Sequence, residues 1–218
     1  LVVAANAWMN SPTGFDYING KYLNIDPIKA MFNEAWFPQA FHMTVAAFGA
    51  TGFAVAGLHA LMILKNKNVN FHKKAFNIAV YFAIIGAFLA PVSGDVAAKS
   101  VAKRQPIKLA AMEAHFDTEK GAAFVVGGIP NEEKMDIKYA IKIPKLLSFL
   151  VSNDFNSEVK GLKDFPRDEW PPVIVVHFAF QIMIFFGMVM MLIGVIYLFA
   201  KFRMKSWLQK KWLYRIFV

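Results

Sequence analysis

Two stretches of this chain run for about 30 residues without a charged side chain, and this feature limits the folds available to it. They cover residues 36–64 and 171–200, and a shorter apolar run covers residues 75–92. Roughly 20 apolar residues suffice for a helix to cross a bilayer. Because lipid offers no partners for exposed backbone groups, such runs span membranes as helices. The sequence therefore predicts an all-α fold, a polytopic transmembrane helical bundle.

The composition agrees with a membrane protein and narrows its chemistry. The chain has 218 residues, of which 57% are hydrophobic and 22 are Phe, and it contains no Cys. A chain without Cys forms no disulfide, thiolate metal site or cysteine-bound iron–sulfur cluster. His and Met are therefore the main candidates for binding a soft or borderline metal.

The charge distribution predicts the orientation in the membrane. The formal net charge is +9, but residues 65–74 and 201–218 hold ten basic side chains and no acidic one, whereas residues 93–172 hold twelve of each sign. Basic stretches between spans stay cytoplasmic. We therefore expect a membrane partner, no nucleic acid partner, and a periplasmic location for the segment between the second and third spans.

That segment, residues 93–170, contains no comparable apolar run, so it is predicted to be a long extramembrane loop. Loops of this length in membrane or soluble domains usually carry a function or a structure of their own. Gln105-Pro106 interrupts the chain, and the residues that follow predict a short helix from Lys108 to Phe116. An ordinary amphipathic surface helix is the alternative interpretation.

Two side chains within the predicted spans are candidate metal ligands. His42 lies six residues into the first span, where an ionisable group is a functional candidate, and imidazole is a common haem ligand. Met183 lies in the third span and offers a thioether. Packing roles are the alternative for both, and His59 and His177 are competing histidines.

Lys108 and Glu113 in the loop could handle a quinol-like hydroxyl, because a carboxylate accepts a proton and an ammonium donates a hydrogen bond. Five residues separate them, which is roughly 140° around a helix, so they do not form a simple helical ion pair. Two solvated surface charges are the alternative interpretation.

Several motifs resemble a known family. They are NAWMNSPTG, FHMTVAAFGATGFAVAGLHA, QPIKLAAMEAHFDT followed by FVVGGIP, and PVIVVHFAFQIMIFFG. In this order and spacing they resemble subunit I of cytochrome bd-type quinol:oxygen oxidases, over essentially the whole chain. QPIKLAAMEA is the most specific of them.

The resemblance implies that His42 and Met183 are the axial ligands of a low-spin haem b. It implies that residues 93–170 form the periplasmic quinol loop, with Lys108 and Glu113 as the residues for oxidation of ubiquinol or menaquinol. Electrons would continue to a high-spin haem b and haem d, where oxygen is reduced in an electrogenic reaction. The implied location is the bacterial cytoplasmic (inner) membrane.

The resemblance also implies that this chain is a piece of the subunit. The family's high-spin haem ligands lie on helices before Leu1 and after Val218, so the remaining helices of subunit I and oxidase subunit II are expected partners. Some relatives carry Arg two residues before the Met ligand, where this chain has Gln181. A non-redox transporter or assembly module with packing histidines is the rival interpretation, and a dihaem cytochrome with His pairs is a third.

Overall fold

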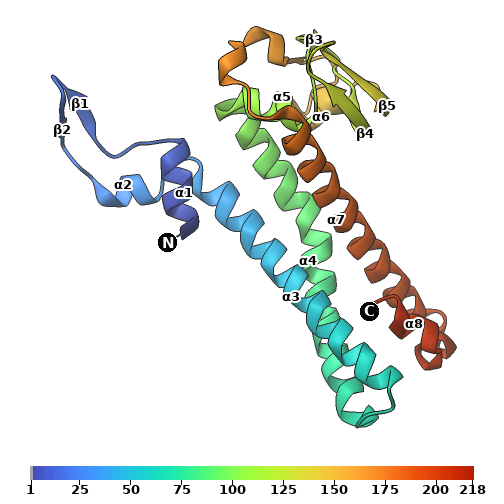
Figure 1. Ribbon diagram of the computed structural model, residues 1–218. Coiled ribbons are helices and arrows are strands. Elements are labelled where there is room, and N and C mark those ends of the chain that lie inside the picture. The colour runs from blue at the N-terminus through green and yellow to red at the C-terminus, as the bar shows by residue number, and fades with distance from the viewer. Residues whose placement is uncertain (1) are drawn as a thin grey trace. The chain divides into compact units, whose positions relative to one another are not determined.

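The computed structural model describes residues 2–218, most of which are helical (Figure 1). The helices are α1 (Val2–Asn10), α2 (Pro27–Met31), α3 (Trp36–Leu64), α4 (Val69–Arg104), α5 (Pro106–Met112), α6 (Leu146–Ser152), α7 (Val173–Phe202) and α8 (Lys211–Arg215). Short 3₁₀ turns form η1 (Leu162–Asp164), η2 (Arg167–Glu169) and η3 (Lys205–Gln209).

The strands form two-stranded antiparallel sheets. These pair β1 (Asp16–Ile18) with β2 (Lys21–Leu23), β3 (Glu119–Lys120) with β6 (Glu158–Val159), and β4 (Phe124–Asn131) with β5 (Asp136–Ile143).

Three helices in the described part of the chain, α3, α4 and α7, are long and apolar enough to cross a membrane. The predicted all-α membrane fold is confirmed. Helix α4 begins before and ends after the predicted span 75–92. Pro91 removes one N–H from its ladder without ending it, whereas α4 ends at Arg104, just before Gln105-Pro106, because a residue preceding proline avoids the helical conformation.

The chain divides into two compact units. The first comprises Leu1–Pro38 with Gly94–Phe185, and the second comprises Gln39–Ser93 with Phe186–Val218. The first contains the whole predicted loop except Ser93, together with the first part of α7.

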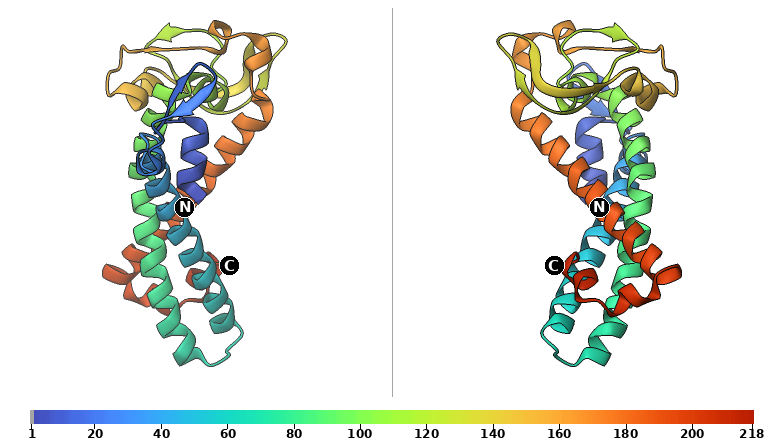
Figure 2. Two further views of the ribbon diagram at one scale, coloured as in Figure 1. Left: turned by 90° about the vertical axis from the view of Figure 1, so that its left-hand side faces the viewer. Right: turned by 90° about the vertical axis from the view of Figure 1, so that its right-hand side faces the viewer.

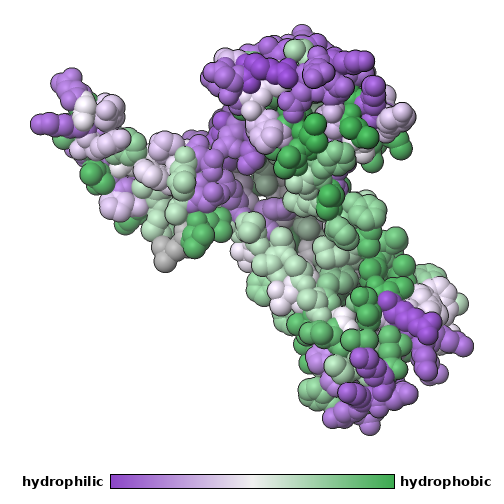
Figure 3. Space-filling model, in the orientation of Figure 1, coloured by the Kyte–Doolittle hydropathy of each residue, from purple (hydrophilic) through white to green (hydrophobic). Residues whose placement is uncertain are grey.

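In the second unit, α3 and α4 pack through small residues. A Cβ added to Gly52 would lie 2.6 Å from the backbone nitrogen of Ala83, and one added to Gly86 would lie 2.6 Å from Cα of Gly49. The backbones therefore meet where only glycine fits, as is usual between membrane helices. Both views in Figure 2 show α3 and α4 joined by a short turn. In Figure 3, hydrophobic residues cover the visible flanks of these helices and hydrophilic ones gather at that turn.

An aromatic cluster is buried in the same unit. Phe76 of α4, Tyr197 of α7 and Phe217 are buried together, with ring centroids 5.0–6.1 Å apart. The hydroxyl group of Tyr197 donates to Oδ1 of Asn77 at 2.8 Å, which satisfies a buried phenol.

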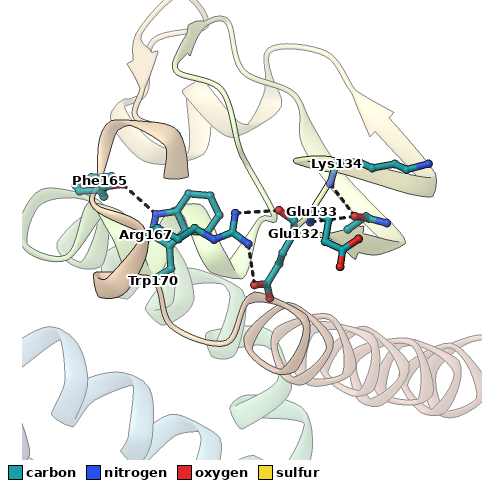
Figure 4. Close-up of polar contacts among 7 residues, drawn as sticks. Glu132, Glu133, Lys134, Phe165, Arg167 and Trp170 are labelled. Atoms are coloured by element: carbon teal, nitrogen blue, oxygen red, sulfur yellow. Dashed lines mark hydrogen bonds and ion pairs between the residues drawn. The ribbon is translucent and has the colours of Figure 1, made fainter.

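In the first unit, the β4–β5 hairpin is anchored at its turn by Arg167 (Figure 4). The Arg167 guanidinium donates to the carbonyl oxygen of Glu132 at 3.0 Å and stacks on the ring of Trp170 at 4.5 Å. The indole of Trp170 in turn donates to the carbonyl oxygen of Phe165 at 3.1 Å. These contacts connect the hairpin turn to the segment that leads into α7.

The glycine contacts give a stability prediction. Replacing Gly52 with Ala should destabilise the protein by about 1–3 kcal/mol, because the new methyl group forces α3 and α4 apart. Gly187→Ala is the control, since no described atom lies within 4 Å of a Cβ at that position. Thermal unfolding in detergent measures both, and equal midpoints for the two variants would contradict close helix packing at Gly52.

Candidate functional site

Helix α5 ends in a Schellman turn that brings two ionisable side chains inward. The amides of Ala114 and His115 donate to the carbonyl oxygens of Ala111 and Ala110 at 3.3 and 2.8 Å, which is the pattern of that motif. Ala114 adopts the left-handed conformation, with φ of 49°, at a position usually held by glycine. The side chains on either side of it, Glu113 and His115, are only 2% and 8% exposed.

This turn also corrects one expectation. The sequence predicted a helix from Lys108 to Phe116, whereas α5 extends over Pro106–Met112. Pro106 occupies the first helical position, and the left-handed Ala114 prevents the helix from continuing.

Strand β4 pairs with β5 along one edge, and side chains satisfy its other edge. Gln181 of α7 donates from Nε2 to the carbonyl oxygen of Val125 at 2.8 Å and accepts from the amide of Gly127 at 3.1 Å. Nε2 of His177 lies 3.2 Å from the carbonyl oxygen of Gly127. The amide of Val125 hydrogen-bonds the Glu113 carboxyl group. The side chains of Glu113, His177 and Gln181 thus bond the edge of β4 that a third strand would otherwise pair with.

His177 is fully buried, and each of its ring nitrogens lies next to a backbone carbonyl oxygen, to one of which a neutral ring donates its N–H. Besides the Gly127 contact, Nδ1 lies 2.9 Å from the carbonyl oxygen of Met112, at the end of α5. This histidine therefore connects α5, β4 and α7. The sequence indicated His177 only as a competing histidine. The signal that could have shown its role is the spacing from His177 to Gln181, which is one helical turn and places both side chains on one polar face.

Burial controls the ionisation of Glu113. Loss of solvation raises its pKa to about 8, and the hydrogen bond from the Val125 backbone opposes that shift. The second carboxyl oxygen, Oε2, has no hydrogen-bond partner among residues 2–218. A buried polar atom without a partner needs an explanation, and a group awaiting a ligand or a proton transfer provides one.

Lys108 lies on the same short helix but is exposed, and it forms no ion pair with any residue that the structure describes. The two predicted quinol residues, Lys108 and Glu113, therefore differ in their exposure to solvent. Glu113 is buried, whereas Lys108 keeps its ammonium group accessible to a molecule that approaches α5.

His42 has the hydrogen bonding that a metal-binding histidine requires. Its Nδ1 lies 3.0 Å from the hydroxyl oxygen of Ser93, which is fully buried. The single hydroxyl hydrogen of Ser93 is donated to the carbonyl oxygen of Ala90 at 3.0 Å. Ser93 must therefore accept a hydrogen from Nδ1 of His42, which leaves the lone pair on Nε2. Haem-binding and metal-binding histidines are commonly oriented in this way.

Met183 of α7 is 52% exposed, so its thioether is not consumed by packing within the described chain. It belongs to the first unit, whereas His42 belongs to the second. The ligand pair His42 and Met183 therefore stays a prediction. Nδ1 of the competing His59 lies 2.8 Å from Nδ1 of His72.

Comparison with known proteins relates the chain to one family. Residues 1–218 match the family model described as cytochrome bd terminal oxidase subunit I. The chain is similar to the structure of bd oxidase from Geobacillus thermodenitrificans, with a TM-score of 0.90 and 34% identity, covering 99% of this chain and 50% of that one.

Two relatives come from Bacillus subtilis. A protein named provisionally as a cytochrome bd menaquinol oxidase subunit I is 38% identical over 95% of this chain and 49% of its own length. Cytochrome bd ubiquinol oxidase subunit 1 is 29% identical over 100% of this chain and 48% of its own length. The chain thus spans about half the length of these relatives.

The buried carboxyl group predicts a measurable protonation state. At neutral pH, the infrared spectrum of the wild type minus that of Glu113→Gln should show the carbonyl band of a protonated carboxylic acid. The band should disappear as the pH rises through about 8. Because the folded state binds this proton more tightly than the unfolded state, the stabilisation due to protonated Glu113 is complete below about 4.5 and lost as the pH rises towards about 8.

The same substitution at Glu133, an exposed residue of the hairpin turn, is the control and should remove no such band. A wild-type spectrum without a protonated carboxyl band at neutral pH would contradict the burial of Glu113.

Proposed function

Because the chain belongs to the cytochrome bd terminal oxidase subunit I family, we propose that it forms the quinol-oxidising and low-spin haem part of such an oxidase. The observation that carries the proposal is Glu113, a buried carboxyl group in the segment QPIKLAAMEA with a pKa of about 8 and one unpartnered oxygen.

Glu113 is proposed to take the proton of a quinol hydroxyl group. A general base is most effective when its pKa lies near the working pH, because it can then both accept the proton and release it. The bond from the Val125 backbone engages the carboxyl group, while Oε2 remains available for the hydroxyl hydrogen. The positioned carboxylate thus acts on one oxygen of the quinol.

Lys108 is proposed to bind a quinol oxygen from the solvent-accessible side of α5. Its ammonium group has three donors and no resident partner in the described ion pairs. Since it donates a hydrogen bond to the bound molecule both before and during oxidation, its main contribution is to affinity.

His42 and Met183 are the residues that would hold a low-spin haem b. When bound, haem b supplies one-electron redox chemistry. The residues present are suited to the group: Ser93 holds the His42 ring with Nε2 as the binding nitrogen, and the Met183 thioether is accessible. A histidine and methionine pair raises the reduction potential relative to anionic ligands.

The wider assignment follows the family. We propose that the chain works in the bacterial cytoplasmic membrane, with the loop 93–170 on the periplasmic side and with oxidase subunit II and further helices of subunit I as partners. The high-spin haem b and haem d of the oxygen site are assigned to those further parts. Quinol protons would then be released outside, consistent with the neutral charge balance of residues 93–172.

The quinol site gives a kinetic prediction for the complete oxidase. Glu113→Gln should lower kcat for quinol oxidation about 100-fold, the lower end of the range for a positioned proton-transfer group. Lys108→Gln should mainly raise KM for quinol. Steady-state oxygen consumption with added quinol measures both, and Glu133→Gln is the matched control. Unchanged turnover of Glu113→Gln would exclude a role for this carboxyl group in quinol oxidation.

The haem ligands give a spectroscopic prediction. In the dithionite-reduced minus oxidised spectrum of membranes containing the complete subunit, His42→Ala should abolish the low-spin haem b signal. Met183→Leu should shift or remove it while the high-spin signals remain, because the variant lacks the thioether but keeps His42.

His177→Gln is the control, since each ring nitrogen of His177 lies next to a backbone carbonyl oxygen and neither is left for iron. A low-spin signal unchanged in both ligand variants would reject the His42 and Met183 pair, and a preparation without any haem would favour a non-redox membrane module.

A further inference from the structure

A polar cavity lies beside the buried turn in the first unit. It has a volume of about 140 Å³ and is lined by His115, Asp117 and Glu119 after α5, by Val125 of β4, and by Asp136 and Lys142 of β5, among others. A water molecule occupies roughly 30 Å³, so a cavity of this size and polarity can hold several. Its lining suits water rather than an apolar ring.

His115 faces this cavity with one unused nitrogen. The side chain is 8% exposed, and Nε2 has no hydrogen-bond partner in the part of the chain that the structure describes. A hydrogen bond to the Val159 backbone engages the ring. Nε2 is thus a buried nitrogen without a partner, on a side chain that lines the cavity.

Glu113 is bonded to a residue that lines this cavity. It lies two residues before His115 across the left-handed Ala114, and its carboxyl group is bonded to the backbone of Val125, which lines the cavity. Glu113 and His115 are buried, whereas Asp117, Glu119 and Asp136, which line the cavity, are exposed. The cavity therefore connects the buried turn with solvent-accessible acidic side chains.

We propose that His115 and this cavity are the exit for the protons taken from quinol. The O–H bond of protonated Glu113 breaks, an N–H bond forms at Nε2 of His115 directly or through cavity water, and the proton then leaves through that water to the exposed acidic side chains. No electrons move in this step. The inference rests on the proposed role of Glu113 as the base for quinol.

The surroundings of His115 suit transient rather than permanent protonation. Burial lowers its pKa, so the ring is neutral at rest and releases a proton readily after it has received one. Glu119 and Asp117 act in the opposite direction and stabilise the imidazolium once it forms, as does the hydrogen bond to Val159, whereas Lys142 disfavours it. A group that accepts and releases a proton easily needs this balance.

The test uses the complete oxidase with His115→Asn. The Asn amide can keep a hydrogen bond to the Val159 backbone but has no nitrogen that accepts a proton. We expect kcat for quinol oxidation to fall about 100-fold, as for loss of a positioned proton-transfer group, with KM unchanged. Added imidazole should restore much of the rate, because it can enter the cavity and carry the proton. His72→Asn is the matched control outside this cavity.

The low-spin haem spectrum reports whether each variant assembles. If His115→Asn does not assemble, His115→Gln replaces it in the test. A kcat that stays at the wild-type value, or that falls without rescue by imidazole, would overturn the exit role of His115. A raised KM with unchanged kcat would overturn it too, since the cavity would then bind the quinol itself. Glu113→Gln, measured in parallel, separates the two proposals. If Glu113→Gln keeps full turnover, the proposed function is rejected. If Glu113→Gln loses turnover while His115→Asn stays active, only the inference about His115 is rejected.

Discussion

The first unit depends on how a buried strand edge is satisfied. Strand β4 has a partner strand on one side only, and a buried backbone group left without a hydrogen bond costs about 1–3 kcal/mol. The groups of Val125 and Gly127 on the open side are bonded instead by Glu113, His177 and Gln181. These side-chain hydrogen bonds stand where a neighbouring strand would pair. They hold the hairpin, the end of α5 and the start of α7 together.

The chemistry of the site follows from that arrangement. Because Glu113 helps to satisfy a backbone amide, it is drawn into a buried position where solvation is lost and its pKa rises to about 8. The same bond leaves one oxygen unpartnered, as described above. The Schellman turn contributes the second element, since the left-handed Ala114 allows the residues on both sides of it to point inward.

The sequence predicted what depends on local pattern. The uncharged run 36–64 has the bounds of α3, and the fold class follows from three apolar runs. The extension of α4 beyond residue 92 was missed because Pro91 and Gly94 normally break helices in water. The β4–β5 hairpin and the burial of Glu113 could not be predicted, since the open edge of β4 is bonded by His177 and Gln181, which lie 50 and 56 residues after their partners in β4.

Gln181 shows how closely the backbone and the site are linked. Some members of the family carry Arg at this position, and a guanidinium group offers only donors. In this chain the open edge of β4 presents a carbonyl oxygen at Val125 and an amide hydrogen at Gly127, so it needs one donor and one acceptor. A neutral amide supplies both, whereas Arg would leave the amide of Gly127 without a partner. The neutral amide of Gln181 therefore matches both backbone groups of the hairpin edge in this chain.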